Sequence, residues 1–138
     1  MDEAKRVLVR NRLIKAQHDL ASARKLSADP DAYRDTAIYF CQQAAEKAMK
    51  AFLVFHDQRF EKIHDIRKLI LQAASVEEKF SIWTEKAAFL TSYVSAFRYP
   101  FENEEPAEPS REEFERALSM AEQVYDFVCS LLPQEVHP

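Results

Sequence analysis

Five polar residues that could do chemistry interrupt an otherwise apolar stretch, residues 37–55. They are two amides, one carboxylate and two lysines: Gln42, Gln43, Glu46, Lys47 and Lys50. Spacings of three and four residues place side chains on the same side of a helix, where Glu46 can pair with Lys50 and Gln43 with Lys47. The group predicts either a solvent-facing strip that supports its helix or one wall of a polar groove.

A second group is the dipeptide His64-Asp65, which precedes a short apolar segment. Asp is one of the residue types preferred at helix N-caps, so Asp65 is expected to begin a short helix. His64 then lies beside the cap. It is either a partly exposed neighbour of the cap or a group that contacts a phosphate or a ribose.

The third group is Arg98-Tyr99-Pro100. Pro100 cannot continue a helix, so the tripeptide marks a helix end. Arg98 at this place either interacts with the last carbonyls and the helix dipole or binds a phosphate. In the second case the neighbouring ring of Tyr99 suits stacking on a base.

Several common functional motifs are absent from the sequence. It contains no P-loop, no dinucleotide-binding fingerprint, no CxxC pair and no HExxH, and it has no Gly at all, which argues against a Gly-rich nucleotide cradle. No Ser or Cys stands in a recognisable nucleophile context. The four histidines are not spaced as metal ligands on one helix face: His18, His56, His64 and His137. We therefore expect no metal site and no cofactor.

Helical periodicity predicts the elements that must position these groups. Residues 1–10 are either a lead-in or an early turn of the first helix. We then expect helices over 11–27, from Asp31 or Asp35 to His56, over 65–74, from Ser81 to Phe97 and from Arg111 to Leu132. The second of these is apolar around most of its circumference and is expected to be central. Ser110 and Glu113 form a capping box for the last helix. The pattern predicts an all-α fold in one domain, residues 1–138: an up-and-down four-helix bundle with one additional short helix, and an acidic, Pro-containing loop over 101–110.

Composition places the chain among ordinary globular proteins, with 47% hydrophobic and 30% charged residues. No apolar run is long enough for a signal peptide or a membrane span. Cys41 and Cys129 both lie in helical apolar patterns and are expected to be buried thiols in a reducing compartment. We therefore expect a cytoplasmic protein that does not bind a membrane.

Charge is unevenly distributed along the chain. Residues 1–101 carry a net charge of +4, and residues 102–138 carry −8. A mildly basic body suits a polyanion, and the acidic tail suits shielding of that body or a basic partner. The alternative is that both are ordinary solvated helix faces.

The three polar groups, in this order, resemble the HEPN domain family, small prokaryotic helical bundles that also occur within larger eukaryotic proteins. The resemblance rests on CQQAAEKAMKAFL at 41–53, HDI at 64–66 with Leu69, RYP at 98–100, and matching apolar positions in the first, fourth and last helices. It implies a four- or five-helix bundle, often a homodimer, that works beside a minimal nucleotidyltransferase, frequently in a two-gene toxin–antitoxin system.

Many members of the family are metal-independent endoribonucleases that carry an Arg, four to six residues, then a His. Arg98 matches that Arg, but the positions of the His are Asn103, Glu104 and Glu105. Acidic side chains there would repel a scissile phosphate. Two formal matches elsewhere, Arg12 to His18 and Arg59 to His64, are of the kind expected by chance.

The sequence therefore leaves three functional hypotheses. The first is a binding module without catalysis, for a nucleotide or an RNA, lined by Gln43, Lys47, Lys50, His64, Asp65, Arg98 and Tyr99. The second is an endoribonuclease toxin, with Arg98 and His64 as the candidate catalytic residues, either in one chain or across a dimer. The third is a structural adaptor that docks a partner through its last helix and acidic tail. The second and the last helices have the widest apolar coats, and a dimer face is expected on one or the other of them.

Overall fold

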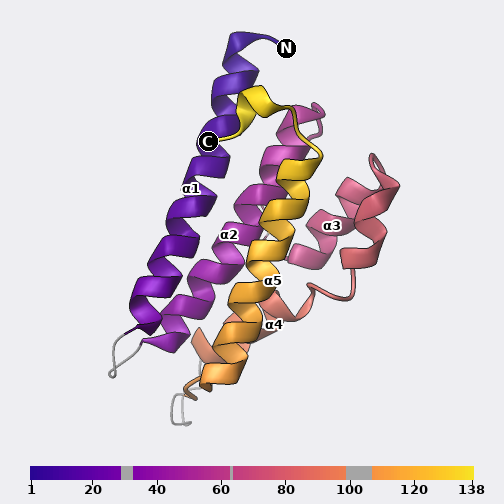
Figure 1. Ribbon diagram of the computed structural model, residues 1–138. Coiled ribbons are helices and arrows are strands. Elements are labelled where there is room, and N and C mark those ends of the chain that lie inside the picture. The colour runs from indigo at the N-terminus through magenta and orange to yellow at the C-terminus, as the bar shows by residue number, and fades with distance from the viewer. Residues whose placement is uncertain (29–32, 63, 99–106) are drawn as a thin grey trace.

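The structure is a computed structural model that describes residues 1–28, 33–62, 64–98 and 107–138. Its elements are α1 (Glu3–Ser27), α2 (Arg34–Phe55), α3 (Ile66–Ala74), the 3₁₀ helix η1 (Glu78–Trp83), α4 (Phe89–Arg98), α5 (Arg111–Ser130) and the 3₁₀ helix η2 (Gln134–Val136). The chain runs down α1, up α2, down α4 and up α5, and α3 and η1 form an excursion beside α2 (Figure 1). The predicted up-and-down bundle of four helices with an additional short one is confirmed.

The helix α2 is central, as its apolar circumference predicts. It contacts α1, α5, α4 and α3, and Figure 1 shows α1 and α5 running alongside it. Its fully buried face is rich in alanine, which lets neighbouring backbones approach closely; the buried apolar residues of α2 are Ala37, Ile38, Cys41, Ala44, Ala45, Ala48, Met49, Ala51, Phe52 and Leu53. Their burial stabilises the position of α2, and with it the position of every polar side chain on that helix.

The C-terminus of α2 closes without a glycine. Asp57 has φ 57°, in the left-handed region that usually favours Gly, and the amide groups of Asp57 and Gln58 donate to the carbonyls of Val54 and Leu53 at 3.0 and 2.9 Å. From α1, the Lys5 ammonium lies 2.9 Å from the Asp57 carboxylate and donates to the Phe55 carbonyl at 3.1 Å. The start of α1 thus fixes the end of α2.

The helix α1 begins at Glu3, because Asp2 caps it by accepting a hydrogen bond from the amide of Lys5. Residues 3–10 therefore form the early part of the first helix, which is one of the two predicted alternatives.

The predicted start of α2 differs from the structure. Asp35 does not cap α2: the N-cap is Tyr33, and Asp35 lies in the first turn, where its charge complements the helix dipole. Asp31, the other predicted cap, lies outside the described residues.

The single helix predicted over 81–97 is wrong. The chain instead forms η1, a run of turns, and then α4 from Phe89. In η1 the side chains three residues apart share one side, which buries Phe80 and Trp83 together. Ala87 in the turns and Leu90 in the first turn of α4 are both buried in the core.

Other helix signals in the sequence are confirmed. Asp65 caps α3 by accepting from the amides of Arg67 and Lys68, and Ser110 and Glu113 form the predicted capping box at the start of α5. The predicted inward residues of α3 are all buried: Ile66, Leu69, Ile70 and Ala73. Of the predicted acidic loop over 101–110, only residues 107–110 are described.

Cys41 and Cys129 are both free thiols. Cys41 is completely buried, and burial raises its pKa to about 12; Cys129 is only half-buried, and burial raises its pKa as well. Thiols held in the protonated form are poor nucleophiles, so neither Cys suits catalysis.

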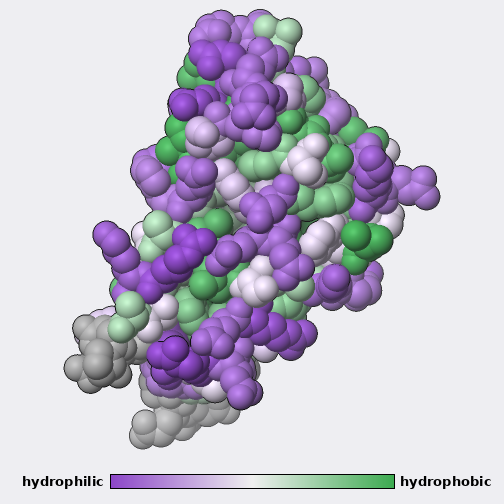
Figure 2. Space-filling view, viewed as in Figure 1, coloured by the Kyte–Doolittle hydropathy of each residue, from purple (hydrophilic) through white to green (hydrophobic). Residues whose placement is uncertain are grey.

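The surface is largely hydrophilic on the face seen in Figure 2, with hydrophobic side chains visible in small patches between the polar ones. In the part of the chain that the structure describes, no helix is both long enough and apolar enough to cross a membrane.

Candidate functional site

A buried carboxylate lies at the centre of the polar group on α2. Glu46 is only 3% exposed, and its oxygens lie 2.6 Å from the Lys50 ammonium, 2.9 and 3.1 Å from Nδ1 of His64, and 3.3 Å from the Gln42 amide nitrogen. A buried charge is tolerated only when it is paired and hydrogen-bonded. The Glu46 carboxylate satisfies this condition by binding three different side chains.

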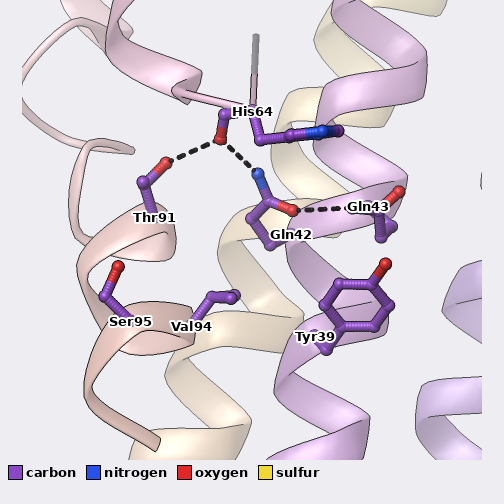
Figure 3. A pocket seen from close by; sticks show the side chains of 7 residues that line it. All are labelled: Tyr39, Gln42, Gln43, His64, Thr91, Val94 and Ser95. Atoms are coloured by element: carbon purple, nitrogen blue, oxygen red, sulfur yellow. Dashed lines mark hydrogen bonds between the residues drawn. The ribbon is translucent and has the colours of Figure 1, made fainter. Parts of the chain in front are cut away.

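His64 is held at both its ring and its backbone. Its carbonyl accepts from the Gln42 amide at 2.7 Å and from the Thr91 hydroxyl at 3.4 Å (Figure 3). The same hydroxyl oxygen of Thr91 accepts from the backbone amide of Ile66 at 3.1 Å. The side chain of His64 is nevertheless 74% exposed. Because an ionised carboxylate can only accept, Nδ1 donates to Glu46 and Nε2 is left available to a ligand.

A pocket of about 230 Å³ opens between α2 and α4, beside His64. From α2 it receives an aromatic ring and two amides, of which Gln43 donates to the Gln42 side-chain oxygen at 3.2 Å. From α4 it receives two hydroxyls and one apolar side chain. Figure 3 shows the lining residues: Tyr39, Gln42, Gln43, His64, Thr91, Val94 and Ser95.

Only some of the binding residues predicted from the sequence line this pocket. Gln43 and His64 line the pocket, whereas Asp65 is engaged as the cap of α3. Lys50 forms the predicted pair with Glu46, but Lys47 binds Asp19 of α1 at 2.5 Å and not Gln43, contrary to the prediction. Neither lysine lines the pocket, because each is directed to a carboxylate beside it.

Arg98 is the last residue of α4, three residues beyond Ser95 of the pocket. Tyr99 and the side chain of Arg98 lie outside the described residues. Their role in binding a phosphate therefore stays a prediction.

Five of the lining residues were not among the predicted binding residues: Tyr39, Gln42, Thr91, Val94 and Ser95. One signal for Gln42 was present in the sequence. Gln42 and Glu46 are spaced by four in a helix that is apolar almost all round, and a polar pair at buried positions needs partners. On α4, Thr91 is one of the residues that carry the family resemblance, but it was not predicted to bind, and Val94 and Ser95 belong to no polar group in the sequence.

The described residues offer no metal centre. Among them, no group of three or more His, Cys, Asp or Glu side chains is arranged to hold a metal ion. The chemistry that this arrangement can supply is hydrogen bonding from amides, hydroxyls and one exposed imidazole.

Comparison with known proteins identifies one family. The model of the HEPN domain matches residues 9–132 of the 138, a range that includes the whole pocket. No curated protein and no solved structure matches the chain.

The Glu46 network should contribute strongly to stability. We expect Glu46→Ala to lower the free energy of unfolding by roughly 3 kcal/mol, because it leaves Lys50 and Gln42 without their shared acceptor in a buried setting. The matched control is Glu115→Ala, which breaks an exposed pair with Arg111 at the same i,i+4 spacing and should cost less than about 0.5 kcal/mol. Urea unfolding followed by circular dichroism measures both. Equal losses in the two variants would contradict this account of Glu46.

Proposed function

The chain belongs to the HEPN domain family, and we propose that it is a nucleotide- or RNA-binding module without catalytic activity of its own. The proposed site is the pocket between α2 and α4. The observation that carries the proposal is that the Glu46 network fixes an exposed imidazole and two amides at this one pocket. A preformed pocket with a few fixed polar groups is the usual form of a small-molecule site.

The size and lining of the pocket suit one nucleoside-sized group. Its volume of about 230 Å³ is below the usual range for drug-sized ligands, roughly 300–1,000 Å³, so a dinucleotide would not fit inside it. The Gln43 amide can both donate to and accept from the edge of a base. Tyr39 and Val94 supply aromatic and apolar surface for a base or a ribose.

The phosphate of such a ligand would lie outside the pocket. Among the described lining residues there is neither a Lys nor an Arg, and Lys50 is already paired with Glu46. We propose that the phosphate is held, as the family resemblance implies, by Arg98, the last residue of α4, and by Tyr99. Arg suits this role because its guanidinium can donate two parallel hydrogen bonds to a phosphate. The Nε2 atom of His64, which carries no proton, would instead accept a hydrogen bond from a ribose hydroxyl.

The proposed partners are a second copy of the chain and a nucleotidyltransferase, in a two-component system of the toxin–antitoxin kind. This part of the proposal rests on the family. The apolar residues of α2 are covered within the chain itself, so of the two helices predicted for a dimer face, α5 is the better candidate. The net charge of −8 over residues 102–138 suits a partner with a basic surface. A structural adaptor without any ligand would bind its partner through the same acidic segment.

Binding through the pocket should depend on Gln43. We expect Gln43→Ala to weaken the binding of a nucleoside monophosphate or a short 5′-phosphorylated RNA roughly tenfold, the equivalent of about 1.4 kcal/mol for one lost polar contact. Gln123→Ala is the matched control, since Gln123 is an exposed glutamine on α5, away from the pocket. Isothermal titration calorimetry with the four nucleoside monophosphates and the RNA measures both variants beside the wild type. The proposal fails if none of these ligands binds, or if Gln43→Ala binds as the wild type does.

One observation favours the second candidate function, an endoribonuclease. A carboxylate that holds Nδ1 of an exposed histidine leaves Nε2 oriented for proton transfer, as a general acid–base requires. Against it, Asn103, Glu104 and Glu105 occupy the positions where catalytic members of the family carry a His.

Cleavage of total RNA separates the two candidates. We expect purified wild-type protein to leave the RNA intact under conditions where a control nuclease cleaves it, because no described residue supplies a second catalytic group beside His64. If the wild type cleaves and His64→Ala or Arg98→Ala does not, the chain is a ribonuclease with a rearranged site.

A further inference from the structure

A second hollow lies between α1 and α2, on the other side of the polar strip of α2. Its volume is about 260 Å³, and it shares no lining residue with the pocket beside His64. Five residues line it: Leu8, Asn11, Arg12, Lys15 and Lys47. We propose that this hollow is a separate binding site for a phosphate group.

The hollow has an excess of positive charge. Among the described residues, Arg12 and Lys15 have no carboxylate within ion-pair distance, whereas Lys47 is paired with Asp19 at 2.5 Å. Three cations therefore face one anion. Unpaired cations that line a concave surface raise the local concentration of anions.

Arg12 is held in place and lacks an acceptor. Its guanidinium lies over the ring of Phe60, 5.8 Å from the centroid, and the ammonium of Lys50 lies 5.6 Å from the centroid of the same ring. The Nε atom of Arg12 is buried and has no hydrogen-bond partner among the described residues. A buried donor without an acceptor is costly. The proposal therefore includes a small shift of the Arg12 side chain that brings Nε to an oxyanion bound in the hollow.

The hollow between α1 and α5 shows that these features are not general to the surface. It is of similar size, about 280 Å³, but its cation is neutralised: Arg24 lies 3.3 Å from Glu122. Asp126 adds a second carboxylate to its lining. Of these two hollows, the one beside Arg12 combines unpaired cations with an unsatisfied donor, and the one beside Arg24 does not.

The remaining lining residues indicate a phosphate that carries an organic group. Leu8 is 47% exposed and gives one apolar wall, and Asn11 adds an amide. Arg and Lys together suit the oxygens of a phosphate monoester or diester. The same chemistry fits the phosphate of a mononucleotide, free inorganic phosphate or the backbone of an RNA strand.

The test removes one charge from the hollow and one from elsewhere on the same helix. Lys15→Gln is compared with Lys25→Gln, whose lysine is exposed near the far end of α1. One probe is inorganic phosphate, followed by the shifts of backbone amide signals in a ¹⁵N–¹H spectrum. The other is a fluorescent single-stranded RNA of about ten nucleotides, whose affinity is measured by anisotropy at several salt concentrations.

We expect phosphate to shift the amide signals around Asn11, Arg12 and Lys15, and Lys15→Gln to weaken this binding while Lys25→Gln does not. If an RNA strand places a backbone phosphate in the hollow, Lys15→Gln also lowers the slope of log affinity against log salt by about 0.7, the value for one phosphate contact to a single strand. If only the inorganic probe responds, the ligand is a free or terminal phosphate.

The inference is overturned if Lys15→Gln and Lys25→Gln bind both probes as the wild type does. That result would leave the proposed function standing, because Gln43→Ala tests the other pocket separately. Conversely, Gln43→Ala could bind nucleotides as the wild type does while Lys15→Gln still weakens phosphate binding. That result would refute nucleotide binding between α2 and α4 and leave the phosphate site in place.

Discussion

The carboxylate of Glu46 lies inside the bundle, where it accepts hydrogen bonds from Lys50, His64 and Gln42. A charge in this place must be compensated, and the compensation determines the geometry around it. Glu46 binds the ring of His64, and Gln42 binds the carbonyl of the same residue. These two contacts hold the connection that follows α2 against the side of that helix. Asp65, the next residue, is the N-cap of α3. The contacts of His64 therefore determine where α3 begins, and with it the position of the segment formed by α3 and η1.

The polar strip of α2 separates two concave surfaces of different character. Toward α4, Gln43 and His64 face a pocket with amides and hydroxyls but no cation among its described residues. Toward α1, Lys47 joins Arg12 and Lys15 in a hollow with excess positive charge. The alanine-rich buried face of α2 keeps both surfaces at fixed places, because that helix packs against four others. We propose a nucleoside as the ligand on one side and a phosphate as the ligand on the other.

Local signals in the sequence predicted most of the fold. The apolar circumference of α2, the cap at Asp65 and the capping box at Ser110 depend on neighbouring residues only, and all three are confirmed. The break between η1 and α4 was missed, since burial of Phe80 and Trp83 depends on packing between segments. The same reason explains why Lys47 was assigned to Gln43: its partner, Asp19, lies on another helix.

The candidate site was predictable only in part. His64 and Gln43 stand out in the sequence because each belongs to a compact polar group. Thr91 and Ser95 lie on α4, far along the chain, and nothing in their own surroundings indicates a pocket. Glu46 was recognised as a partner of Lys50, yet its burial and its contact with His64 arise only when the connection after α2 folds back onto that helix.

The most direct test of this account is the tautomer of His64, measured from the long-range ¹⁵N–¹H couplings of its ring at alkaline pH, where a histidine is neutral. Because the Glu46 carboxylate accepts from Nδ1, we predict that the proton resides on Nδ1 and that Nε2 is bare. Glu46→Gln should shift the ring toward the mixture of tautomers seen for an unconstrained histidine. A proton on Nε2 in the wild-type protein, or a ring that does not respond to the Glu46 substitution, would contradict the central role given to this contact.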